Sequence, residues 1–165
     1  MEQTDENKII EASKRVYQQL GCGHNEHIYH KALVYELNCL GYNLDTEMNL
    51  LVKYKDSKGN THVLASERID VFIHGINIVL ELKATAKPIQ SQEFAQIKKY
   101  FNELNKLNIK VNYGVIINFI QPNSKEIPKD LEYKIVENSS VNGTNSLNVN
   151  NNNSLNVNNT NSVNK

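Results

Sequence analysis

The stretch that decides the fold is residues 67–83, Glu-Arg-Ile-Asp-Val-Phe-Ile-His-Gly-Ile-Asn-Ile-Val-Leu-Glu-Leu-Lys. Apolar and polar residues alternate on both sides of His74-Gly75, which predicts two strands, 61–73 and 76–83, joined by a tight turn. Glu81 and Lys83 stand near the end of the second strand, which is otherwise mostly apolar. Charged side chains are seldom buried without a partner or a task, so this strand end is a candidate site.

Three charges of this hairpin are expected to meet. Glu81 and Lys83 are two apart in a strand and therefore share a face. Pairing across the turn can bring Asp70 close to Glu81, and two carboxylates at that range repel unless a cation such as Mg²⁺ lies between them. The ordinary alternative is a salt-bridged strand end, Glu81 to Arg68 or to Lys83. On the first strand, one face is expected to carry Ile69, Val71 and Ile73, and the other Arg68, Asp70 and Phe72.

Helices and further strands surround the hairpin. Spacings of three and four predict helices over about 6–20, 25–40 and 91–107. Their expected inward residues are Ile9, Ile10, Val16 and Leu20; Tyr29, Leu33, Leu37 and Leu40; and Phe94, Ile97, Phe101, Leu104 and Leu107. Strands are predicted at 46–54, at 111–119 in a central place, and at 131–136 on an edge. The order α-α-β-β-β-α-β predicts a three-stranded antiparallel meander and a helical crossover to one further strand.

Composition limits the protein's class. The 165 residues carry 18 Lys+Arg and 18 Asp+Glu, so the chain is not a bulk polycation and any nucleic-acid contact must come from a local patch. Residues 138–165 hold 13 Asn and a single side-chain charge, which predicts a disordered low-complexity tail after a domain of residues 1–137. The acidic N-terminus, two lone cysteines and the absence of a long apolar run favour a soluble, intracellular protein without a membrane partner.

A second motif opens the second predicted helix. Gly23-His-Asn-Glu-His-Ile-Tyr29 has the pattern Gly-x-x-Glu-x-x-Tyr, in which Glu26 and Tyr29 share a helix face. On the long third helix, Gln96 and Tyr100 are four apart. Together with Glu67-Arg68-Ile-Asp70 and Glu81-Leu-Lys83, these residues resemble the GxxExxY family of the PD-(D/E)XK nuclease superfamily over about residues 7–137, with Ile69 where the superfamily's name has Pro.

This resemblance implies a fold and a site. The fold is α/β and restriction-endonuclease-like, an α-β-β-β-α-β core whose mixed sheet is flanked by helices, with an extra N-terminal helix. Asp70 and Glu81 would bind Mg²⁺ or Mn²⁺ with the Leu82 carbonyl and Glu26, and Lys83 would be catalytic with both acids. Supporting or substrate-binding roles would fall to Tyr29, Arg68, Gln96 and Tyr100. The plainer alternatives are a helix-start carboxylate for Glu26 and a solvated helix edge for Gln96 and Tyr100.

Two other groups of side chains invite a functional interpretation. Cys22, His24, His27 and His30 are all zinc-ligand types, but they lack any common zinc spacing, and exposed histidines are the expectation. Lys98 and Lys99 of the third helix, with Lys87, Lys106 and Lys110 nearby, could meet phosphates or could form a solvated face.

The function expected from the sequence is Mg²⁺-dependent hydrolysis of phosphodiester bonds by a metal-dependent nuclease, with DNA as the expected partner. The alternative is a nuclease-like module that binds nucleic acid or a protein partner and cuts little or nothing. Retention of Asp70, Glu81 and Lys83 favours the enzyme, whereas the near-neutral charge favours the module.

Overall fold

A computed structural model describes residues 3–139, so the tail predicted from residue 138 lies almost entirely outside the described residues. The elements are α1 (Asp5–Leu20), α2 (Glu26–Cys39), β1 (Leu44–Lys55), β2 (Thr61–Ile73), β3 (Ile78–Lys83), α3 (Ser91–Lys106), β4 (Tyr113–Asn118) and β5 (Glu132–Glu137). None of the helices in the described range is long and apolar enough to cross a membrane.

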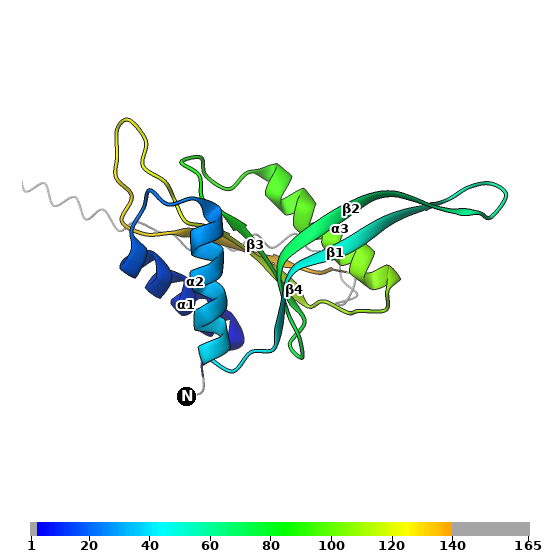
Figure 1. The fold of residues 1–165 in the computed structure, drawn as a ribbon, viewed down its shortest axis with the longest axis horizontal. Coiled ribbons are helices and arrows are strands. Elements are labelled where there is room, and N and C mark those ends of the chain that lie inside the picture. Colours follow the sequence, from blue (N-terminus) through cyan, green and yellow to red (C-terminus); the bar gives the residue numbers. More distant parts are fainter. Residues whose placement is uncertain (1–2, 140–165) are drawn as a thin grey trace, which may run out of the picture.

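The five strands form one mixed sheet in the order β1-β2-β3-β4-β5 (Figure 1). Strands β1, β2 and β3 pair antiparallel with their neighbours. Helix α3 connects β3 to β4, which pairs parallel with β3, and β5 pairs antiparallel with β4. The predicted α/β fold is confirmed, with its meander, helical crossover, central β4, edge strand and extra N-terminal helix.

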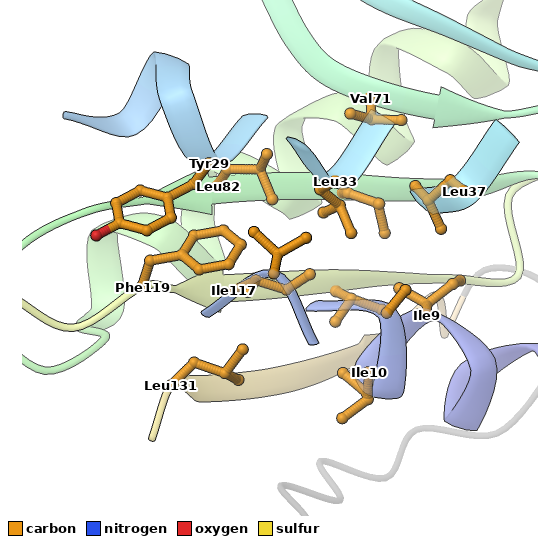
Figure 2. Packing of buried hydrophobic residues seen from close by; sticks show 14 of the residues in the cluster. Ile9, Ile10, Tyr29, Leu33, Leu37, Val71, Leu82, Ile117, Phe119 and Leu131 are labelled. Atoms are coloured by element: carbon orange, nitrogen blue, oxygen red, sulfur yellow. The ribbon is translucent and has the colours of Figure 1, made fainter. Parts of the chain in front are cut away.

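Helices cover the sheet from two sides and divide the core. Leu80, Leu82 and Ile117 pack against α1 and α2, and the ring of Tyr29 lies on that of Phe119 with centroids 4.6 Å apart (Figure 2). On the other side, α3 packs against the sheet through Ile97, Tyr100, Phe101 and Leu104. A side chain at Gly114 of β4 would come within 2.8 Å of Ile97, so glycine lets α3 approach the sheet closely.

Three details differ from the sequence-based expectations. Leu40 and Leu107 were expected inside, but they are 48% and 53% exposed because each caps a helix C-terminus and lies beyond its last turn. Strand β3 begins at Ile78 rather than at residue 76, because Asn77 has a positive φ of 49° and belongs to the turn. Ile69 packs with the α3-side cluster and not with Val71 and Ile73.

The reason for the Ile69 difference is a local break in the β1–β2 ladder. Thr46 pairs with Val71 and Met48 with Ile69, but no pair joins Glu47 and Asp70 between them. Glu47 has a positive φ of 54°, which departs from strand geometry. The alternation of faces is therefore interrupted at Asp70.

Candidate active site

Asp70 is held at the point where β2 and β3 separate. The paired residues of these strands end with Val71 and Leu80. One carboxylate oxygen of Asp70 then accepts a hydrogen bond from the Leu82 backbone N–H at 2.7 Å. On the α2 side, a ring nitrogen of His30 lies 3.1 Å from the Asp70 carbonyl oxygen. Asp70 is thus fixed by the strand that carries Glu81, as the pairing argument predicts.

Glu81 is a carboxylate in an almost fully enclosed place, with 1% of its surface exposed. Burial and, after it, the negative charge of Asp70 raise the pKa of Glu81 to about 7, against hydrogen bonds from Lys83 and Tyr100 that lower it. The two acids therefore lie close enough to repel each other. A bound cation would stabilise the charged form of a buried carboxylate that has a raised pKa and lies beside a second carboxylate.

Lys83 pairs with Glu81 along the same face of β3. Its ammonium group donates a hydrogen bond to the Glu81 carboxylate, so the salt-bridged strand end is present in this structure. Burial lowers the pKa of Lys83, but the hydrogen bond and charge of Glu81, with the charges of Glu26 and Asp70, outweigh it and raise the pKa overall. Lys83 remains a cation among three carboxylates.

Glu26 reaches the same cluster from the first turn of α2. Burial raises the pKa of its carboxyl group and Asp70 adds to the rise, while Lys83 and a hydrogen bond from the Ala84 backbone lower it. The carboxylate thus faces Lys83, Asp70 and the end of β3. Glu26 is also an exposed carboxylate in the first turn of α2, so the plainer alternative of a helix-start carboxylate fits this position as well.

Tyr100 and Gln96 approach from α3, on the other side of the sheet. The Tyr100 hydroxyl lies 2.6 Å from the Arg68 carbonyl oxygen and 3.2 Å from a Glu81 carboxylate oxygen, and it accepts a hydrogen bond from Gln96 at 2.5 Å. Tyr100 is fully buried, so the solvated helix edge that was the alternative is wrong for Tyr100. Arg68 points its guanidinium group away, to Glu47 at 3.3 Å.

Tyr29 shapes the loop before α2 and does not reach the carboxylates through any described hydrogen bond. Its hydroxyl donates to the Gly21 carbonyl oxygen at 2.8 Å. It accepts from the His24 backbone N–H at 3.4 Å and from the Gln121 amide at 3.2 Å. Gln121 also accepts from the Gly23 backbone N–H at 2.7 Å. The glycine-to-tyrosine motif therefore builds the turn that positions Glu26.

Sequence reasoning missed Asn118, at the end of β4. Its buried amide accepts from the Thr85 backbone N–H at 3.1 Å and donates to the Lys87 carbonyl oxygen at 2.9 Å. Asn118 thereby holds the segment that follows Lys83. The available signal was a polar residue at the end of an apolar strand, where an unpaired amide would be costly.

The lysines of α3 have uneven surroundings. Lys99 forms an ion pair with Glu67 at 2.8 Å, and Lys106 with Glu103 at 2.7 Å, whereas Lys98 is exposed and forms no ion pair within residues 3–139. The predicted patch is therefore partly neutralised.

The described side chains include no ready-made metal cage. Across the described part of the chain, no group of three or more His, Cys, Asp or Glu side chains is arranged to hold a metal ion. Neither the residues Cys22, His24, His27 and His30 nor the three acids Glu26, Asp70 and Glu81 form such a group. Asp70 and Glu81 supply two oxygen-bearing side chains, and a further oxygen would have to come from the Leu82 carbonyl or from a movement of Glu26.

Comparisons with known proteins identify the family of the chain. The family model of the PD-(D/E)XK nuclease superfamily matches residues 3–129. No curated protein matches the chain. A solved structure titled "Crystal structure of SSO0001" is 19% identical with a TM-score of 0.48, and the alignment covers 68% of this chain and 50% of the other. This chain therefore spans about half the length of that protein.

Proposed function

Because this chain belongs to the PD-(D/E)XK nuclease superfamily, we propose that it is a divalent-metal-dependent nuclease that hydrolyses phosphodiester bonds in DNA. The observation that carries the proposal is the end of β3. There the buried Glu81 carboxylate lies beside Asp70, with Lys83 on the same strand face. The Glu26 and Tyr29 motif further supports placement in the GxxExxY branch.

Members of this superfamily typically use divalent metals, and the residues present suit one. Asp70 and Glu81 would hold Mg²⁺ or Mn²⁺, helped by the Leu82 carbonyl and Glu26, because hard cations prefer oxygen ligands. The raised pKa of Glu81 fits this role, since a cation would relieve its repulsion with Asp70. When bound, the ion would polarise the phosphodiester and lower the pKa of the attacking water.

The other side chains have separate tasks in the proposed reaction. Lys83 keeps its positive charge and offsets the negative charge that grows on the phosphate. Tyr100 and Gln96 position Glu81 through the Tyr100 hydroxyl, which also touches the Arg68 carbonyl oxygen. Lys98 and Lys99 lie on the exposed side of α3, where they would meet the phosphate backbone.

The test is a cleavage assay with Mg²⁺ or Mn²⁺ on single-stranded, double-stranded and branched DNA and on RNA. Wild-type protein is expected to cut DNA, and Lys83→Ala is the control for contaminating nucleases. Cleavage that is equal in the two proteins, or that needs no divalent ion, would contradict the proposal. Preference for RNA would correct the substrate alone.

A second candidate is a module that binds nucleic acid or a protein partner without cutting. The Lys83–Glu81 ion pair favours it, because this pairing compensates the buried carboxylate without any metal. Isothermal titration calorimetry separates the two candidates. Heat from Mg²⁺ or Mn²⁺ binding that disappears in Asp70→Asn favours the nuclease, and its absence at millimolar concentration favours the module.

A further inference from the structure

The β1–β2 hairpin extends well beyond the helices that cover the rest of the sheet (Figure 1). The last ladder pair with a buried residue is Leu50 with Glu67. Five residues of β1 follow before the turn, a reach of about 17 Å at ~3.3 Å per residue. We call residues 51–64 the hairpin arm. Every residue from 51 to 66 is exposed or half-buried, and the arm adjoins α3 at its base, where Leu51 and Lys53 line a pocket with Glu103, Lys106 and Leu107.

The charges of the arm are mostly positive. It contains Lys53, Lys55 and Lys58 against one carboxylate, Asp56. That carboxylate is used by the arm's own turn: it accepts from the Lys58 and Asn60 backbone N–H groups, each at 2.9 Å, and contacts His62 at 2.9 Å. Lys53 and Lys55 form no ion pair with any residue of the described range.

The strand register collects these cations on one face. Residues 49, 51, 53 and 55 alternate to the same side of β1. Their partners on β2 lie on the same face. The register shifts between Val52 and Lys53, so that Val52 pairs with Ala65 and Lys53 pairs with Val63. The resulting basic face consists of Asn49, Leu51, Lys53, Lys55, Thr61, Val63, Ser66 and Arg68. It combines positive charges with hydroxyl and amide donors, the groups that contact phosphates.

This basic face leads to the candidate active site. Arg68, the innermost β2 residue of this face, is two residues from Asp70, so the row ends beside the point where the face alternation is interrupted at Asp70. Glu47 of β1 is already paired with Arg68 of this row at 3.3 Å. A polyanion that extends from Asp70 along the arm would therefore meet Lys53 and Lys55. The residues of the basic face include no carboxylate that would repel it.

From this arrangement we infer that the hairpin arm is a nucleic-acid-binding element that grips duplex DNA beside the bond to be cut. The inference rests on the proposed nuclease function and names how its substrate is held. Lys53 and Lys55 contact backbone phosphates, while the exposed apolar residues Leu51 and Val63 meet sugars or base edges. The major groove of DNA is about 12 Å wide and admits a two-stranded ribbon. With a reach of about 17 Å, the arm covers roughly five base pairs at ~3.4 Å each.

The experiment compares three full-length proteins: wild type, Lys53→Ala with Lys55→Ala, and a control, Lys8→Ala with Lys14→Ala. The control removes the same charge from α1, where Lys8 and Lys14 form ion pairs with Asp5 and Glu11. Affinity for a labelled DNA duplex is measured in Ca²⁺, across about 50–200 mM salt. Cleavage at saturating duplex is measured in Mg²⁺, and melting temperatures verify folding.

We expect the arm variant to bind about tenfold or more weakly than wild type, with a salt-dependence slope shallower by about two, because two phosphate contacts are lost. Its rate at saturating duplex should stay near that of wild type, and the α1 control should behave as wild type in every measurement. A duplex footprint should lose protection on one side of the cleaved bond.

Two results would overturn the inference in distinguishable ways. If wild type binds and cuts DNA and the arm variant matches it, the arm is not the binding element and the nuclease proposal stands. If wild type neither binds nor cuts nucleic acid, both proposals fail together. Sedimentation of wild type and the arm variant then shows whether the exposed arm instead joins two copies of the chain.

Discussion

The Asp70 carboxylate accepts a hydrogen bond from the Leu82 backbone N–H at 2.7 Å. This bond comes directly after the last paired residues of β2 and β3, Val71 and Leu80. The side chain of one strand thus continues the ladder where the backbones separate. As a result, Asp70 is positioned by the backbone amide of Leu82, the residue next to Glu81.

The closeness of the two acids predicts a response to metal ions. Mg²⁺ or Mn²⁺ should raise the melting temperature of wild type, because a ligand that binds only the native state stabilises it by mass action. Asp70→Asn should abolish this response. The metal-free variant should be slightly more stable than metal-free wild type, because a like-charge interaction with Glu81 has been removed. Differential scanning calorimetry measures both effects.

Asp45→Asn is the matched control for this measurement. Asp45 lies at the start of β1, where it is exposed and contacts His74 at 2.9 Å. That variant should keep the full metal response. A response that survives in Asp70→Asn would exclude Asp70 as a ligand.

The raised pKa of Glu81 predicts how the stability of the metal-free protein depends on pH. Its ordinary value is 4.5 and its folded value is about 7, so folding favours the protonated form. The contribution is fully present below about pH 4.5 and is lost as the pH rises through about 7. Glu81→Gln should remove this loss, so the variant should gain on the order of 3 kcal/mol relative to wild type between these limits.

Urea unfolding at a series of pH values measures this difference. Glu11→Gln, on the exposed side of α1, is the control and should follow wild type apart from the small effect of its pair with Lys14. A constant difference between Glu81→Gln and wild type across the whole range would mean that Glu81 is ionised normally in the folded protein.

Tyr29 is predicted to act on stability rather than on the reaction. Tyr29→Phe removes the hydroxyl that donates to the Gly21 carbonyl oxygen at 2.8 Å and accepts from Gln121 at 3.2 Å. The loss should cost about 1–2 kcal/mol of unfolding free energy. The ring and its stacking on Phe119 remain, so kcat at a temperature well below melting should stay near wild type.

Tyr35→Phe provides the comparison, because Tyr35 is 71% exposed and should change neither stability nor rate. A large fall in kcat for Tyr29→Phe, with stability unchanged, would instead give Tyr29 a direct role with the substrate.

The order of elements could be predicted because each has a clear local pattern. The 61–73 and 76–83 strands follow a period of two, and the 91–107 helix follows the helical period, so the crossover and the approach of Asp70 to Glu81 follow from connectivity. The errors occur where geometry departs from those periods. Ile69 was misplaced because the unpaired Glu47 opposite Asp70, with its positive φ, interrupts the alternation.

The candidate site was predicted less completely than the fold. Glu26 could be proposed only through the family resemblance, since nothing in strand pairing brings α2 to the end of β3. The support from Asn118, which holds the Thr85 and Lys87 backbone, depends on contacts between segments about 30 residues apart. A single sequence does not encode such contacts as a spacing. The projection of the hairpin arm likewise depends on which faces the helices leave uncovered.

The end of the domain also allows a sharp test. The sequence assigns residue 138 to the tail, but Asn138 is buried, its backbone N–H donates to the Asn112 carbonyl oxygen at 3.0 Å, and its amide donates to the Val111 carbonyl oxygen at 2.9 Å. A chain that ends at residue 138 should therefore be more stable by about 1–2 kcal/mol than one that ends at residue 137. Equal denaturation midpoints for these two chains would show that the contacts of Asn138 add nothing.

The last prediction separates chemistry from binding at Lys83. A cation cannot be a metal ligand, so the proposed role of Lys83 is limited to the water and to the charge that develops on the phosphate. An interaction made mainly in the transition state changes kcat and hardly changes ground-state affinity. Lys83→Ala should therefore reduce cleavage by ~10²-fold or more, while DNA affinity in Ca²⁺ stays near wild type.

The matched comparison is Lys98→Ala with Lys99→Ala, on the exposed side of α3. This double variant should show weaker binding and a shallower salt dependence with a nearly normal rate at saturating DNA. The effect is expected to come mainly from Lys98, because Lys99 is already paired with Glu67 at 2.8 Å. If Lys83→Ala cuts as fast as wild type, its ion pair with Glu81 is only a strand-end salt bridge, and the chain has the nuclease fold without its lysine chemistry.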